Sequence, residues 1–468
     1  MPELLSPAGS LKNMRYAFAY GADAVYAGQP RYSLRVRNNE FTLDNLAIGI
    51  HEAHQQQKQF YVVSNIAPHN SKLKTYIQDL APVIALKPDA LIMSDPGLIM
   101  MVQDAFPQQC IHLSVQANAV NYASVKFWAK QGIKRVILSR ELGLAEIEEI
   151  RQQCPDTELE VFVHGALCMA YSGRCLLSGY MNKRDPNQGS CTNACRWSYH
   201  TQKAEQDDAG NFISLNHYDQ TTNAQNNSAQ NNSAHCAPKA KATAPTLGLG
   251  ASAKDAYLIT ERMRPNDPMP AFEDEHGTYI MNSRDLRAVQ HVHALSKMGI
   301  DSLKIEGRTK SFYYCARTAQ VYRQVIEDAK AGIAFSPEYL YELDKLANRG
   351  YTEGFLRRHT HDMYQNYETG ASVSDKQKLV GEVIEVLNDS HVVVEVKNRF
   401  SVGDSLEYMS PQGNCTFRLH EMYDKQEESV RMAPGSGYIV KLKLPEIATA
   451  SEFGIFLRNL QDAETTRG

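Results

Sequence analysis

The sequence contains no long apolar run: no stretch of its 468 residues approaches the about 18 consecutive apolar residues of a membrane-spanning helix. The first residues, Met1–Leu5, show no basic segment followed by an apolar run, so we expect no secretory signal and predict a cytoplasmic protein. The motifs HExxH and GxSxG are also absent. Zinc-protease and serine-hydrolase mechanisms therefore have no sequence motif to rest on.

The chain also has little net charge. The chain has 49 Lys and Arg against 53 Asp and Glu, a formal net charge of −4, with 43% hydrophobic and 22% charged residues. This composition excludes a collagen-like, largely disordered or supercharged protein. It gives no long-range attraction to nucleic acid, so an RNA partner would need a locally basic surface.

Cysteines are few, but four of the nine lie close together in residues 168–195. Disulfides are rare in a reducing compartment, so clustered thiols indicate a metal or redox site first. Their spacing is C-x6-C-x15-C-x3-C. Four thiolates suit an iron–sulfur cluster or a tetrahedral zinc site, and the spacing alone does not choose between them or exclude simple packing. The four are Cys168, Cys175, Cys191 and Cys195.

Short β-rich runs alternate with amphipathic helical patterns through the first 310 residues, and we count eight such runs. This alternation predicts parallel βαβ units, and eight of them favour a closed (β/α)8 TIM-like barrel over a doubly wound open sheet. The predicted strands are Glu3–Ser6, Ala24–Ala27, Phe60–Asn65, Ala90–Ser94, Ile111–Gln116, Arg135–Ser139, Glu160–His164 and Ser302–Glu306.

The domain boundaries follow from breaks in this pattern. We assign residues 1–335 to the barrel, with a cysteine-bearing insertion after strand seven at 165–280. Within it, an Asn/Gln/Ser/Ala-rich tract at about 201–254 is predicted to be a disordered loop. A helix from Asp285 to Met298 should then lead into the last strand. Residues 336–375 form a linking segment, and period-two alternation predicts a small C-terminal antiparallel β-barrel at 376–468.

Polar residues follow every predicted strand at its carboxyl end, which is where a barrel places its active site. His164 and Glu306 are the candidates for acid–base catalysis. Arg35, Arg140 and Arg308 are the candidates for binding anionic groups. The alternatives are a structural histidine and a solvated arginine loop.

Five separated motifs carry a family resemblance. They resemble the collagenase-like peptidase family of unknown catalytic type, the "U" peptidases, over nearly the whole chain. The motifs are Pro2–Gly9, Gly21–Gly28, Phe162–Cys168, Tyr171–Ser178 and Ser302–Arg308.

The resemblance implies hydroxylation rather than proteolysis, because bacterial family members hydroxylate tRNA wobble uridine, ribosomal RNA or a ubiquinone precursor. It implies a [4Fe–4S] cluster held by the four cysteines at 168, 175, 191 and 195. It also implies a route to 5-hydroxyuridine that depends on prephenate, a small anionic metabolite.

Our leading hypothesis is an iron–sulfur-dependent tRNA-modifying enzyme that takes a flipped uridine of the anticodon region into the barrel mouth. A metal-dependent collagenase-like peptidase is the alternative, and zinc is the alternative metal. A third possibility is a non-catalytic scaffold that recruits a separate hydroxylase.

Overall fold

The computed structural model describes residues 1–29, 31–34, 40–167, 284–348, 350–357 and 376–460 in full. Between residues 168 and 283 it describes only the backbone of five short strands. No helix within these ranges is long and apolar enough to cross a membrane.

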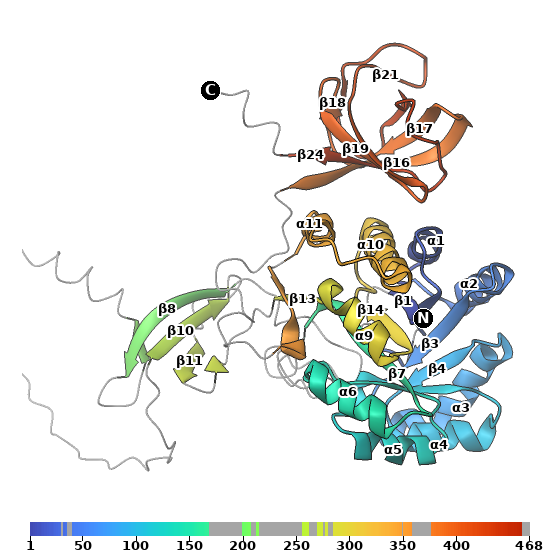
Figure 1. The fold of residues 1–468 in the computed structure, drawn as a ribbon, viewed down its shortest axis with the longest axis vertical. Helices are drawn as coiled ribbons and strands as arrows, with labels where there is room; N and C mark the ends of the chain where they lie inside the picture. Colours follow the sequence, from blue (N-terminus) through green and yellow to red (C-terminus); the bar gives the residue numbers. More distant parts are fainter. Residues whose placement is uncertain are drawn as a thin grey trace, which may run out of the picture. The chain divides into compact units, whose positions relative to one another are not determined.

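Eight parallel strands form a closed barrel in the first part of the chain (Figure 1). Neighbours pair in the order β14-β1-β2-β3-β4-β5-β6-β7, and a parallel β14–β7 ladder closes the ring. The (β/α)8 prediction is therefore confirmed. The strands are β1 (Glu3–Pro7), β2 (Ala24–Gly28), β3 (Gln59–Ser64), β4 (Ala90–Met93), β5 (Ile111–Leu113), β6 (Arg135–Ile137), β7 (Glu158–Ala166) and β14 (Ser302–Ile305).

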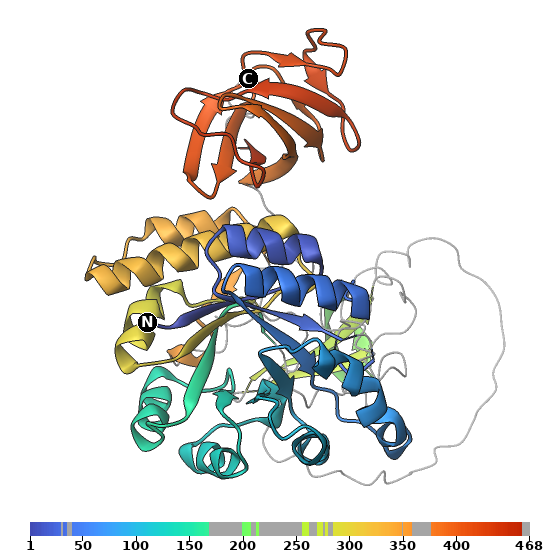
Figure 2. The ribbon, with the colours of Figure 1, turned by 90° about the vertical axis from the view of Figure 1, so that its right-hand side faces the viewer.

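Helices surround the barrel, as Figure 2 shows from the side. Several begin at a side chain that caps free backbone N–H groups: the Ser10 hydroxyl accepts from Asn13 N, and Asp95 accepts from Leu98 N just before Pro96. The helices are α1 (Leu11–Ala19), α2 (Leu43–Gln55), α3 (Asn70–Ala85), α4 (Pro96–Ala105), α5 (Tyr122–Lys130), α6 (Leu144–Gln153), α9 (Val292–Met298), α10 (Phe312–Ala331) and α11 (Glu338–Asp344).

Two strands outside the eight extend this sheet beside β7. Strand β13 (Asp285–Arg287) pairs antiparallel with β7, and β15 (Tyr351–Thr352) pairs parallel with β13. The predicted helix from Asp285 is therefore wrong over its first turn. The hydrogen-bond partners of β13 come from β7, more than a hundred residues earlier in the chain, and local sequence periodicity cannot show such a pairing.

The insertion is a unit separate from the barrel and the C-terminal sheet. Its antiparallel sheet has the order β12-β11-β10-β8-β9. Strand β9 and most of β8 fall within the tract predicted to be disordered, where β8 pairs with β10 and β9 pairs with β8. The rest of the tract lies outside the described residues. The strands are β8 (Tyr199–Gln206), β9 (Phe212–Ser214), β10 (Asp255–Glu261), β11 (Met269–Asp274) and β12 (Gly277–Thr278).

The C-terminal part is an antiparallel sheet domain with its own apolar core, as the alternation predicts. Seven strands pair in the order β20-β19-β24-β16-β17-β23-β21, and β18 pairs with β22. Their bounds are β16 (Gln377–Asn388), β17 (His391–Val396), β18 (Phe400–Ser401), β19 (Ser405–Ser410), β20 (Gly413–Arg418), β21 (Met422–Tyr423), β22 (Met432–Ala433), β23 (Ile439–Lys443) and β24 (Ile455–Asn459).

This domain packs against helices α1 and α10 of the barrel. The Tyr20 hydroxyl donates to the carbonyl oxygens of Met409 and Phe453 at 3.1 and 2.8 Å. The guanidinium of Arg317, fully buried on α10, contacts a carboxylate oxygen of Glu407 on β19 at 2.6 Å. Barrel and C-terminal sheet thus share a buried, charge-paired contact.

Candidate functional site

Amide and hydroxyl side chains line the barrel mouth at the carboxyl ends of β2, β3 and β5. Gln29 donates to the Ser64 hydroxyl at 2.9 Å. Asn65 donates to Gln116 Oε1 at 2.9 Å and to the Ser114 hydroxyl at 3.3 Å. Gln29 and Asn65 are buried, so these bonds hold neutral donors and acceptors in fixed orientations. Such amides can bind the alternating donor and acceptor edge of a nucleobase.

An ion pair spans the loops after β6 and β14. Arg140 Nη2 lies 3.0 Å from Glu306 Oε2, and the side chains are only 9% and 12% exposed. The Arg140 guanidinium also lies 3.7 Å from the centre of the Phe162 ring. The Tyr314 hydroxyl donates to the Glu306 carbonyl oxygen at 2.7 Å and fixes that loop. The structure thus brings together two of the residues predicted from the sequence.

Arg308 lies beside the end of β2. Its guanidinium donates to the Leu34 carbonyl oxygen at 2.7 Å. A Cβ at Gly28 would come within 2.4 Å of Arg308 Nη1, so only glycine allows this approach. Arg308 lines a cavity of about 570 Å³ together with Lys310 and Glu40. This arginine is therefore held where it can contact an anionic group at the mouth.

His164 lies away from the barrel lumen. The pairing of β7 with β14 skips one residue, since Lys304 pairs with Phe162 and Ile305 with His164. This bulge turns the imidazole toward α10, where Nδ1 lies 3.3 Å from the Tyr322 hydroxyl and the ring contacts Tyr314.

Burial lowers the pKa of His164 to about 3, which keeps the ring neutral. The geometry favours the structural-histidine alternative over a proton donor at the mouth.

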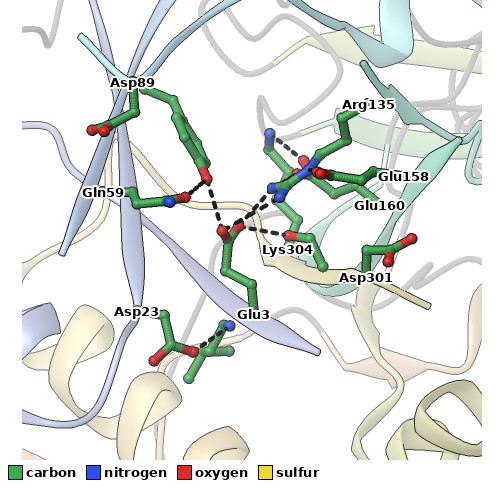
Figure 3. A network of polar contacts seen from close by, with 12 residues as sticks. Glu3, Asp23, Gln59, Asp89, Arg135, Glu158, Glu160, Asp301 and Lys304 are labelled. Carbon is green, nitrogen blue, oxygen red and sulfur yellow. Dashed lines mark hydrogen bonds and ion pairs between the residues drawn. The ribbon is translucent and has the colours of Figure 1, made fainter. Parts of the chain in front are cut away.

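A buried network of charges forms the floor of the barrel (Figure 3). Arg135 Nη1 contacts Glu3 at 2.7 Å and Glu160 at 3.3 Å. The Lys304 ammonium contacts the other oxygen of Glu160 at 2.7 Å. Burial lowers the pKa of Lys304, while Glu160 opposes that shift and favours the charged form. Removing one partner of a buried ion pair lowers the stability of the fold strongly, because the other charge is left buried without a counter-charge.

The floor network and the mouth meet at one aromatic ring. The Lys304 ammonium lies 5.5 Å from the centre of the Phe162 ring, which also contacts Arg140. Through Lys304, the network therefore contacts the Phe162 ring that packs against the Arg140 guanidinium. Glu3, Arg135, Glu160 and Phe162 were not among the site residues predicted from the sequence, although charged residues inside otherwise apolar strands were an available signal for the first three.

The four clustered cysteines and Arg35 lie outside the described residues, so the description of the site does not include their positions. Leu167, the last described residue before the cysteines, follows β7 at the mouth end of the barrel. The four cysteines within the described ranges are free thiols. Burial raises the pKa of the Cys315 thiol to about 12. Those ranges contain no group of three or more His, Cys, Asp or Glu side chains placed to hold a metal ion.

Comparison with known proteins gives full-length matches. The model of Peptidase family U32 matches residues 9–366, and that of the Peptidase family U32 C-terminal domain matches residues 375–455. The tRNA hydroxylation protein P of Escherichia coli (strain K12) is 62% identical, covering 100% of this chain and 98% of that protein.

Two further relatives are similar over most of the chain. The tRNA hydroxylation protein P of Haemophilus influenzae is 61% identical and covers 99% of this chain and 97% of its own length. The 23S rRNA 5-hydroxycytidine C2501 synthase of Escherichia coli (strain K12) is 27% identical, covering 92% of this chain and 56% of that protein.

Proposed function

This chain belongs to peptidase family U32, and from that premise we propose that it hydroxylates the wobble uridine of tRNA to 5-hydroxyuridine. The observation that carries the proposal is the 62% identity, over the full chain, to a protein named for tRNA hydroxylation. The 27% identity to an rRNA 5-hydroxycytidine synthase supports the same class of reaction, hydroxylation of a pyrimidine in RNA.

The mouth suits a pyrimidine base that has left its stack. A base stacked in an anticodon loop cannot reach a barrel mouth, so the target uridine would be flipped into it. The amides of Gln29, Asn65 and Gln116 offer donors and acceptors to the O4, N3 and O2 edge of uracil. The guanidinium of Arg140 would bind an anionic group while Glu306 keeps it oriented.

The chemistry of the donor set fits an iron–sulfur cluster. Four cysteines lie within residues 168–195, after β7, whereas burial raises the pKa of the Cys315 thiol, which makes it a poor ligand. Cys168, Cys175, Cys191 and Cys195 would hold a [4Fe–4S] cluster, with zinc as the alternative. Such a cluster would supply electrons or a binding site for the oxygen donor.

A small anionic metabolite is the proposed co-substrate, with prephenate as the specific candidate. Glu306 and the Leu34 carbonyl oxygen hold the guanidinium groups of Arg140 and Arg308 on the loops after β6 and β14, and two guanidinium groups suit a dicarboxylate. Arg35 is a further proposed contact.

The test is nucleoside mass spectrometry of tRNA from a deletion strain that expresses Glu306→Gln. This variant keeps the side-chain size but removes the charge that orients Arg140. Loss of 5-hydroxyuridine derivatives from cells with wild-type protein levels is expected. Normal modification would instead favour the scaffold alternative, in which a separate enzyme performs the reaction.

The peptidase alternative has its own assay. Metal-replete, purified protein is incubated with gelatin, and the fragments are resolved on a gel. Our proposal predicts no hydrolysis; hydrolysis that survives further purification would favour the peptidase.

A further inference from the structure

Two cavities adjoin at the start of α10. One, of about 570 Å³, lies at the barrel mouth and is lined by Arg308, Lys310 and Ser311. The other, of about 550 Å³, lies where the barrel meets the C-terminal sheet and is also lined by Lys310 and Ser311. Because they share these two lining residues, the cavities lie next to each other at the start of α10, and we refer to the two together as the groove.

The charge of this groove is strongly one-sided. Six cationic side chains line it, against a single carboxylate, Glu40. Ion pairs with carboxylates partly offset this charge: Lys12 pairs with Glu382, Lys345 with Glu407 and Glu342, and Arg458 with Asp404. The six are Lys12, Arg308, Lys310, Lys345, Lys378 and Arg458.

We propose that this groove holds the phosphate backbone of the substrate RNA and leads it from the C-terminal sheet to the barrel mouth. The inference rests on the proposed function and adds the place where the RNA strand lies. A chain with net charge −4 needs such a local basic surface to bind RNA.

Beyond Arg308 at its mouth end, the groove has features that suit a nucleic-acid strand. Its cations are spread over two adjoining cavities and five segments of the chain, instead of converging on one point. Aromatic side chains at the start of α10 adjoin them: Phe312 lines one cavity, and the buried Tyr313 and Tyr314 line the other. Basic grooves with aromatic side chains are typical of single-stranded nucleic-acid sites.

Lys378 is the most informative position for a test. It is exposed on β16, and no carboxylate of the described residues pairs with it. Charge reversal at Lys378 should therefore leave the fold intact. Lys443 is a matched control because it is also an exposed lysine, on β23 of the same sheet, and lines neither cavity.

The experiment measures binding of purified, unmodified tRNA by fluorescence anisotropy at several salt concentrations. The proteins are the full-length wild type, Lys378→Glu, Lys310→Gln and Lys443→Glu. Removing one phosphate contact should weaken binding at least about threefold at moderate salt and should lower the slope of log affinity against log salt by about 1. Lys443→Glu should bind as the wild type does.

The outcomes separate the two proposals. If the wild type binds tRNA and both groove variants bind it with the affinity and salt slope of the wild type, the proposal that the groove binds RNA is overturned and the proposed function stands. If wild type binds no tRNA at any salt concentration, the proposed function is overturned, and the groove assignment with it. Circular dichroism of each variant confirms that it is folded.

Discussion

Replacing Glu407 should reveal how strongly the C-terminal sheet is coupled to the barrel. Glu407 lies on β19 with its side chain only 4% exposed, and it contacts Arg317 at 2.6 Å and Lys345 at 2.9 Å. Arg317 is fully buried on α10. Among the described residues, the other carboxylate partner of Arg317 is Glu342, whose side chain is 29% exposed. Glu407→Gln would therefore leave a buried guanidinium without its best-buried counter-charge.

The pKa of Glu407 gives the size of its contribution to the free energy of unfolding. Burial alone would raise this pKa, but Arg317 and Lys345 lower it from the ordinary value of 4.5 to about 2. A shift of this size corresponds to about 3 kcal/mol of stabilisation at neutral pH, since each tenfold change in proton affinity is worth about 1.4 kcal/mol. Removing one partner of a buried ion pair typically costs roughly 3–5 kcal/mol, which agrees.

The pH dependence has a definite sign. The lowered pKa means that the stabilisation is fully present above the unfolded-state pKa and is lost as the pH falls toward 2. Urea denaturation of wild type and Glu407→Gln should therefore differ by about 3 kcal/mol at pH 7 and by progressively less below pH 4.5. Glu385→Gln, an exposed glutamate on β16, is the control. Equal stability of Glu407→Gln and wild type at pH 7 would refute the reasoning.

Three further predictions concern the mouth and its surroundings. Arg140→Lys should lower 5-hydroxyuridine in cellular tRNA at least about tenfold, because an ammonium cannot bind Glu306 and an anion through a planar fork, with little change in melting temperature. Gly165→Ala should destabilise the fold by roughly 1–3 kcal/mol in urea denaturation, since φ is +105° and the new Cβ would lie 2.3 Å from the Glu306 carbonyl oxygen. His164→Phe should lose less stability than wild type between pH 7 and pH 5, by about 2 kcal/mol, because the buried imidazole, with its pKa near 3, takes up a proton only on unfolding. An equal loss would mean that His164 is accessible to protons.

The barrel itself could be predicted from the sequence because each βα unit carries a local signal. Apolar strands and capped helices follow one another along the chain, and closure places the loops after β6 and β14 near each other. The meeting of Arg140 with Glu306 follows from that topology.

Features that depend on distant pairing could not be predicted. The bulge between Phe162 and His164 changes the side-chain alternation of β7, so the sequence pattern wrongly suggests that His164 faces the lumen. Strand β13 looks like the start of a helix, because only its pairing with β7 defines it. The Arg317–Glu407 contact joins two domains whose relative placement has no local signal.

The most direct test of the central claim is nucleoside mass spectrometry of total tRNA from a deletion strain complemented with wild type or Cys175→Ala. Our account predicts that 5-hydroxyuridine derivatives vanish on deletion, return with wild type and stay absent with Cys175→Ala. Purified Cys175→Ala should also lose iron and acid-labile sulfide. Unchanged 5-hydroxyuridine in the deletion strain, with no second protein of this family in the cell, would contradict the account.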